Sequence, residues 1–302
     1  MAPRVPGTCF DRAISLTAIS VSFHNPSDPT MKPTRMRPGS GVEPATDPPR
    51  IFSPQYYARM RLLEADSWWN AAMRDIGGSL LEDARLPERG LLIDAGCGSG
   101  QTIAWFQGHR PMWTAAGLDV SRDGLTAARN FGHQVVQASA TALSHPDACA
   151  DLIITFDVLQ HLPLDGGDSD ALSEMFRVLK PGGVLLIRTN AQAFPRARDD
   201  RDYNFRKYTP ELLRLRVGSA GFDIETLGRV NALLGLAEIP REMRARHSQS
   251  SEYHGILSEP RSTRSLAGIA KRRWLALEGR ALRRGWQLPL GRTILALCRR
   301  PA

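Results

Sequence analysis

The chain has 302 residues, which is enough for one large α/β domain with extensions. Its hydrophobic fraction of 42% supports a buried core, and no apolar run reaches the ~20 residues that a membrane-spanning helix needs. The formal net charge of +8 is uneven, because residues 241–302 hold 14 Lys/Arg and four Asp/Glu while the rest is nearly neutral. Enzymes that act on nucleic acids more often carry such charge around the active site, so we expect no nucleic-acid partner.

Cysteine usage narrows the protein classes further. The four cysteines are scattered without the C-x-x-C spacing of zinc sites, so we expect no metal site. A reducing cytoplasm is the expected compartment.

The first part of the chain is irregular and then helical. Residues 1–50 contain nine prolines and no long periodic segment. Such a segment cannot bury enough apolar surface to offset the conformational entropy that it would lose on folding. We predict a disordered extension there. Residues 54–84 carry leucines and methionines among charged residues, which predicts helices.

From residue 90 onward, apolar strands alternate with helical segments. The first strand, GLLIDAG at 90–96, is apolar up to Asp94, which is typical of a parallel strand buried on both faces. Further strands are predicted at 114–119, 134–138, 151–156, 183–189, 222–228 and 293–298. Helices are predicted at 101–107, 122–130, 169–179 and 210–220. This alternation predicts βαβ units in a parallel sheet.

The segment LLIDAGCGSG at 91–100 is the most informative motif. Three glycines, Gly96, Gly98 and Gly100, follow Asp94 and form the turn from strand into helix. Glycine lets the backbone turn sharply and approach a ligand closely. The helix N-terminus then offers free N–H groups to an anion, either a phosphate or a carboxylate.

Rival interpretations of this loop fit less well. A dinucleotide fingerprint, G-x-G-x-x-G, requires glycine where Gln101 stands, and here the third glycine comes one residue early. A P-loop is excluded because Gly-Lys-Ser/Thr is missing. A tight strand-to-helix turn without a ligand is the third interpretation.

Asp119, in GLDVS at 117–121, ends the second strand. A carboxylate there can accept hydrogen bonds from both hydroxyls of a ribose. The alternative is a surface Asp that caps the helix at 122–130, a role that Ser121 can take instead.

The motifs together resemble the class I S-adenosylmethionine (SAM)-dependent methyltransferases in order and spacing, roughly over residues 90–230. They are DAGCGSG, GLDVS, DLIITFDVLQHL and FRVLKPGGVLLIRT. The resemblance implies SAM as cofactor and an α/β, Rossmann-like, seven-stranded, mostly parallel sheet with helices on both faces. Segments 60–76, 206–224 and 288–301 resemble a bacterial subgroup associated with glycan, lipid or secondary-metabolite pathways.

The resemblance also implies a domain division. A methyltransferase domain would take residues 51–302, with N-terminal helices at 51–89 and a core at 90–229. A basic helical insertion, 230–291, would precede the last strand at 292–300.

In such enzymes the glycine loop holds the methionine part of SAM, Asp119 binds the ribose, and residues after the third strand flank the adenine. The implied cofactor contacts are Asp94, Gly96, Cys97, Gly98, Gly100, Asp119, Val120, Ser139, Ala140, Phe156 and Asp157. Ser139 stands where the family usually has an Asp for the adenine amino group. Ser139 or a backbone carbonyl would accept that hydrogen bond here.

Methyl transfer from a sulfonium is an in-line displacement that depends mainly on alignment, and a hydroxyl acceptor also benefits from a general base. His161 is the candidate base, because it follows the fourth strand at the carboxyl edge of the sheet. The alternative is a His that packs against the cofactor. Candidate acceptor contacts are Tyr57, Arg206 and Tyr208, the last two also explicable as an ordinary loop before a helix.

The basic insertion contains one helical stripe. Ala270, Trp274, Leu277 and Ala281 follow the spacing of one helix face, and arginines surround them. One interpretation is a solvated helix packed on the domain. The other is an interfacial helix that meets anionic lipid or a charged glycan, at the inner face of the membrane.

The predicted function is SAM-dependent methyl transfer to an O or N atom of a small molecule, lipid or saccharide. One alternative is an RNA or protein methyltransferase, although the Asn/Asp-Pro-Pro-Tyr/Phe motif of amino methylation is replaced by Asp157-Val158-Leu159. Another alternative is a non-catalytic SAM-binding protein. The sequence makes no prediction of oligomeric state.

Overall fold

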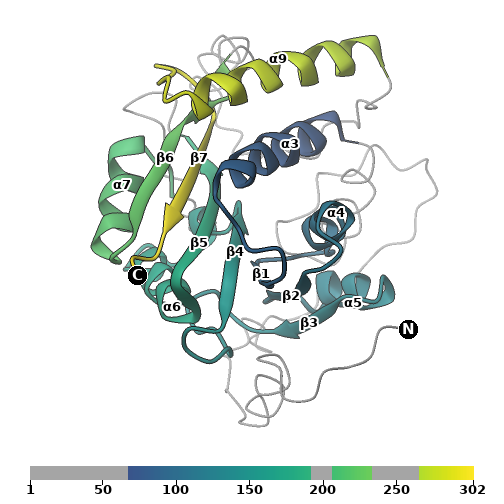
Figure 1. The fold of residues 1–302 in the computed structure, drawn as a ribbon, viewed down its shortest axis with the longest axis vertical. Helices are drawn as coiled ribbons and strands as arrows, with labels where there is room; N and C mark the ends of the chain where they lie inside the picture. The colour runs from purple at the N-terminus through teal and green to yellow at the C-terminus, as the bar shows by residue number, and fades with distance from the viewer. Residues whose placement is uncertain (1–66, 192–205, 233–264) are drawn as a thin grey trace, which may run out of the picture.

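The computed structural model describes residues 67–191, 206–232 and 265–302. The predicted N-terminal extension and Tyr57 lie outside these residues, as does much of the insertion. Figure 1 shows a central sheet with helices packed against it.

Seven strands form one sheet in the order β3-β2-β1-β4-β5-β7-β6. Their bounds are β1 Leu91–Ala95, β2 Thr114–Asp119, β3 Gln134–Gln137, β4 Ala150–Phe156, β5 Leu179–Asn190, β6 Asp223–Val230 and β7 Thr293–Arg299. Strands β1 to β5 pair in parallel, and β7 runs antiparallel between β5 and β6. All seven strands were predicted, so the α/β fold class is confirmed.

Several of the helices begin at a Ser or Thr cap, and the described residues form six α-helices and one 3-10 turn. They are α3 Trp68–Asp83, α4 Gln101–His109, α5 Arg122–Asn130, a 3-10 turn η1 Leu159–His161, α6 Gly167–Val178, α7 Pro210–Ser219 and α9 Leu266–Arg283. The hydroxyls of Ser67, Ser121 and Thr209 accept an amide N–H from the first turn of α3, α5 and α7. Ser121 therefore caps α5, which leaves Asp119 available for another role.

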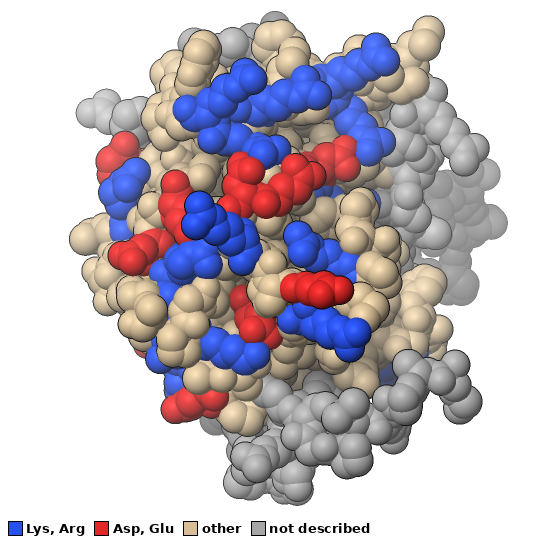
Figure 2. Space-filling view, in the orientation of Figure 1, with Lys and Arg blue, Asp and Glu red and all other residues tan. Residues whose placement is uncertain are grey.

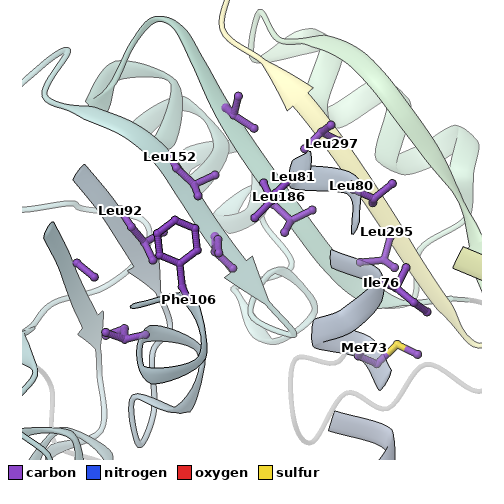
Figure 3. Close-up of a cluster of buried hydrophobic side chains, with 14 of the residues drawn as sticks. Met73, Ile76, Leu80, Leu81, Leu92, Phe106, Leu152, Leu186, Leu295 and Leu297 are labelled. Atoms are coloured by element: carbon purple, nitrogen blue, oxygen red, sulfur yellow. The ribbon is translucent and has the colours of Figure 1, made fainter. Parts of the chain in front are cut away.

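The sheet separates two apolar layers. One layer joins α3, α4, α5 and α9 to the sheet, and the other joins α6 and α7 to the opposite face. Figure 3 shows Met73, Ile76 and Leu80 of α3 among leucines of β4, β5 and β7. Burying each such side chain contributes about 1.5–3 kcal/mol relative to leaving it exposed. The packing of α3 therefore fixes that helix over the middle of the sheet.

Strand β5 begins earlier than predicted. The Pro181-Gly182-Gly183 turn was expected to start the strand, but Leu179 already pairs with Ala150 of β4. The register shifts after that pair, and Gly182 has φ +77, so the turn lies inside the strand as an irregularity.

The insertion helix α9 packs through a face other than the predicted stripe. Its buried residues are Gly268, Leu275, Glu278, Gly279 and Leu282. A Cβ at Gly279 would lie 2.8 Å from Ile76 Cγ1, so glycine permits the close approach of α9 to α3. In the predicted stripe, Trp274 and Leu277 are instead 45% and 53% exposed. The stripe therefore faces away from the domain.

Within the described ranges, no helix is long and apolar enough to cross a membrane. The same residues contain no group of three or more His, Cys, Asp or Glu side chains that could hold a metal ion.

One buried histidine makes the stability of the fold depend on pH. His145 is 3% exposed, and neither ring nitrogen has a hydrogen-bond partner among the described residues. Burial and the nearby Arg177 guanidinium disfavour the charged imidazole and lower its pKa to about 4. In the unfolded chain the pKa of this group returns to about 6.5.

We therefore predict that the free energy of unfolding decreases as pH falls from 6.5 to about 4. In this window the unfolded chain binds a proton that the folded protein excludes, which costs up to about 3 kcal/mol. The variant His145→Leu should show a shallower acid loss in urea unfolding at a series of pH values. His109→Leu, at an exposed position, is the control, and identical pH slopes in all three proteins would contradict the prediction.

Candidate cofactor site

The glycine loop leaves β1 and is held by the end of β2. The amides of Gly96 and Cys97 both donate to the carbonyl oxygen of Leu118, at 2.8 and 2.9 Å. Gly96, Gly98 and Gly100 have φ values of +94, +49 and +83. A Cβ at Gly96 would lie 2.1 Å from Val158 Cγ2, so this position has no room for a side chain.

Asp119 ties the loop to the second strand. Its Oδ2 accepts from the amide of Gly98 at 2.9 Å, and its Oδ1 accepts from the amide of Ser121 at 2.8 Å. Burial raises the pKa of the Asp119 carboxyl, and these two amide hydrogen bonds oppose the rise. An ionised carboxylate can accept about four hydrogen bonds, so two acceptor positions remain for ribose hydroxyls.

The N-terminus of α4 is open to an anion. Its cap residue is Gly100, which has no side chain to accept from the first-turn amides. A Cβ at Gly98 would meet nothing within 4 Å, so open space lies beside the loop. Asp94 is buried at the end of β1. Cys97 is also buried, and burial together with Asp94 raises the pKa of its thiol well above its usual value, which makes it a poor nucleophile.

The segment after β3 forms a small polar turn. Ser139 and Thr141 share a hydrogen bond between their hydroxyls at 2.8 Å, and Ser139 Oγ also accepts from the Thr141 amide. Ala140 is buried, whereas Val120, after β2, is 56% exposed. Thr141 was not predicted, and its contact with Ser139 orients the hydroxyl at the predicted adenine position.

An ion pair between the buried Arg188 and the half-buried Asp157 lies at the carboxyl end of β4 and β5. Asp157 has φ +59, and its Oδ2 accepts from Arg188 Nη2 at 2.6 Å and from Nε at 2.9 Å. The Arg188 guanidinium lies 4.5 Å from the Phe156 ring centroid and 5.0 Å from the Trp69 ring centroid. The pair thus connects the end of β4 to α3.

Neither Arg188 nor Trp69 was among the predicted site residues. The available signal was one arginine near the end of the otherwise apolar run VLLIRT. A charge in a strand buried on both faces requires a partner, and that partner is Asp157.

His161 ends η1 beside this ion pair. Gln160 Oε1 accepts from the amide of Asn190 at 2.8 Å, which orients the Gln160 side-chain amide. Its Nε2 then donates to His161 Nε2 at 3.3 Å, an arrangement that needs an unprotonated Nε2. Burial lowers the pKa of His161, and the Asp157 carboxylate opposes this shift. Burial thus favours the neutral imidazole, but its Nε2 lone pair is held by Gln160, which must move before Nε2 can take a proton.

Arg206 and Tyr208 lie in the core and not on an acceptor surface. Arg206 Nη1 lies 3.0 Å from Asp168 Oδ1, and the Tyr208 hydroxyl donates to Asp168 Oδ2 at 3.0 Å. Asp168 and Tyr208 are fully buried, and burial raises the pKa of Tyr208. Arg206 also donates to the carbonyl of Leu164 at 2.8 Å. The structure places this pair differently from the predicted acceptor contacts, because the Asp168 charge needs both partners.

The comparisons with known proteins agree with this geometry. A family described as "Methyltransferase domain" matches residues 93–187. A trans-aconitate 2-methyltransferase of an Azoarcus strain is 33% identical over 143 residues, which are 47% of this chain and 53% of that protein. This family match contains the glycine loop, Asp119 and Asp157.

Residues 93–187 thus match a methyltransferase domain. A tRNA (carboxymethyluridine(34)-5-O)-methyltransferase of Arabidopsis thaliana is 33% identical over 34% of this chain and 24% of that protein. The chain thus spans about a quarter to about a half of these two relatives. Phosphoethanolamine N-methyltransferase 2 of Haemonchus contortus, solved with SAM, shares the fold at TM-score 0.53 and 17% identity, over 83% of this chain and 58% of that one.

The residues at the site fit the cofactor of this class. The open α4 N-terminus suits the SAM carboxylate, and the remaining acceptor positions of Asp119 suit the ribose. No side chain of residues 67–191, 206–232 and 265–302 fills the space beside Gly98.

We predict that the Arg188–Asp157 pair stabilises the fold through its burial. Their side chains are 9% and 25% exposed, so Arg188→Met should lower the free energy of unfolding by about 2–3 kcal/mol, because Asp157 loses its counter-charge. Urea unfolding of Arg188→Met, Asp157→Asn and the double variant should give a coupling of about 1–3 kcal/mol. The exposed Arg272–Asp75 pair supplies the control, Arg272→Met, with a change below about 1 kcal/mol. Additive effects of the two single substitutions would contradict the prediction.

Proposed function

We propose that this protein transfers a methyl group from SAM to an O or N atom of a small molecule, lipid or saccharide in the cytoplasm. The observation that carries the proposal is the glycine loop, held by Leu118 and Asp119 beside an uncapped helix N-terminus. The match of this segment to a methyltransferase family supports it. Alignment of the acceptor with the sulfonium methyl group supplies most of the rate, because the leaving group is already activated.

In the proposed complex each part of SAM has its own contacts. The loop and the α4 N-terminus hold the methionine end, with Phe156 and Asp157 beside it. Asp119 accepts hydrogen bonds from the ribose, and the adenine lies between Val120 and the Ser139-Ala140 turn. Arg188 positions Asp157 through the ion pair and does not itself touch the cofactor in this proposal.

SAM supplies a methyl group bound to a positively charged sulfur. A lone pair of the acceptor forms the new C–O or C–N bond, and the electron pair of the S–C bond stays on sulfur. A hydroxyl acceptor must also lose its proton. His161 is the group proposed to take it, because the imidazole is held neutral near the end of β4.

An RNA acceptor is the second candidate, and a specific observation favours it. One relative is named as a tRNA methyltransferase, although this chain covers only 24% of it. Among the described residues, Arg188 and Arg206 are each paired with an Asp, so neither offers an unpaired charge to an RNA phosphate. The small-molecule class therefore remains the proposal.

We predict that Gly98→Ala weakens cofactor binding while the fold survives. Gly98 and Gly132 both have positive φ, and an added Cβ meets nothing within 4 Å at either position. Each substitution should therefore cost a similar ~1–2 kcal/mol of stability. Only the Gly98 methyl group would enter the space proposed for SAM, so its affinity should fall about 10-fold or more.

Calorimetry with SAM, its demethylated product and NAD measures this, followed by transfer of labelled methyl to metabolite and tRNA pools. Wild type and Gly132→Ala should bind SAM and methylate an acceptor from the metabolite pool. Binding of NAD in place of SAM would overturn the cofactor assignment. If labelled tRNA were the sole product, the acceptor would be RNA and not a small molecule, lipid or saccharide. SAM binding without any methylated product would favour a non-catalytic role.

His161→Ala separates a base from a residue that packs on the cofactor. If His161 takes the acceptor proton, turnover should fall ~100-fold or more, with SAM affinity unchanged. The wild-type rate should fall on the acidic side below pH 6.5, because burial lowers the pKa of His161, and the variant should lack this limb. Steady-state kinetics across pH with the identified acceptor measures both. Near-normal turnover of the folded variant would reject the base role.

A further inference from the structure

The face of α9 that points away from the domain is unusually apolar. We define this outward face by Leu266, Ile269, Arg273, Trp274, Leu277, Arg280 and Arg284, with Trp286 directly after the helix. Leu266 is 87% exposed and Trp286 is 69% exposed. Residues 266–286 supply five of the ten exposed large hydrophobic side chains of the described chain. Isolated exposed residues need no explanation, but a cluster on one helix face marks an interaction surface.

The arginines at 272–284 divide into two groups. Arg272 and Arg283 pair with Asp75 and Asp83 of α3, each at 2.7 Å. These contacts hold α9 on α3, and they also turn the opposite face outward. Figure 2 shows Lys and Arg side chains along the top of the molecule, where Figure 1 places α9, and a band of acidic side chains below them.

The second group consists of Arg273, Arg280 and Arg284. All three are exposed, and no ion pair joins them to another described residue. The outward face contains no acidic residue, because Glu278 is buried and accepts from the amide of Asn231 and from Trp274 Nε1. The face thus combines free positive charge with exposed Leu and Trp.

This combination selects among possible occupants. A second copy of the chain in a two-fold contact would place arginines of one outward face against those of the other. A nucleic acid would use the arginines but would gain nothing from Leu266 and Leu277 in water. A helix with basic residues beside Trp and Leu matches the chemistry of an anionic lipid surface.

We propose that the outward face of α9 docks on a membrane that contains anionic lipid. The leucines and tryptophans enter the boundary between headgroups and acyl chains, and the three arginines meet lipid phosphates. The helix lies in the plane of the membrane and does not cross it. The inference adds a partner to the proposed methyltransferase, but vesicle binding needs neither SAM nor an acceptor, so the two proposals can fail separately.

Co-sedimentation of the full chain with vesicles tests the proposal. The protein should bind phosphatidylcholine vesicles that contain phosphatidylglycerol, and should not bind pure phosphatidylcholine. Added salt should weaken the binding, because screening reduces the arginine contribution. Tryptophan emission should shift to the blue on binding, and Trp286→Phe should reduce the shift.

Two sets of substitutions separate the apolar from the charged contribution. Arg273→Gln, Arg280→Gln and Arg284→Gln together should weaken binding on the order of 100-fold. Leu266→Ser with Leu277→Ser should weaken it about 10-fold or more. Leu215→Ser with Arg214→Gln, at exposed positions on α7, is the matched control and should bind as wild type.

Every variant changes exposed residues, so thermal unfolding should stay near that of the wild type. Failure of the wild type to bind anionic vesicles would overturn the proposal. Unchanged vesicle binding in the leucine variant would also overturn it. RNA binding that only the arginine variant loses would assign the surface to nucleic acid instead.

Discussion

The hold of β2 on the glycine loop is the constraint on which the rest of this site depends. The carbonyl oxygen of Leu118 accepts hydrogen bonds from the amides of Gly96 and Cys97, and the Asp119 carboxylate accepts one from the amide of Gly98. Val158, after β4, closes the other side of Gly96. The loop is held from both neighbouring strands, and α4 starts with its first-turn amides uncovered because its cap residue, Gly100, has no side chain to accept from them. The same geometry places the carboxylate that would bind ribose beside the helix end that would bind the methionine carboxylate.

A second constraint is electrostatic and joins the N-terminal helix to the carboxyl edge of the sheet. Arg188 would be costly inside a strand buried on both faces without Asp157 and the two aromatic rings beside it. Trp69 belongs to α3, so the packing of this helix and the position of the Arg188 guanidinium depend on each other. Through Gly279 and the α3 carboxylates, α9 is then fixed on α3.

The core strands could be predicted because a parallel strand that is buried on both faces has a nearly continuous run of apolar residues in its sequence. The turn at Gly96 and Gly98 and the strand-end position of Asp119 could be predicted because both follow from local residue types, whereas their contact with SAM stays a prediction. Arg206 and Tyr208 could not, since their shared partner, Asp168, lies about forty residues away in the sequence. A basic residue near a strand end has the same local pattern whether it meets a ligand or a buried acid.

The sequence by itself determined the order of strands and helices, the glycine loop and the charge imbalance of the C-terminal part, because each is a local or compositional property. Only the tertiary structure decided which face of α9 is buried. The spacing of Trp274 and Leu277 identifies a stripe, but not its direction. Gly279 beside Ile76, and Arg272 and Arg283 opposite the acids of α3, set that direction, and these contacts join residues about 200 positions apart.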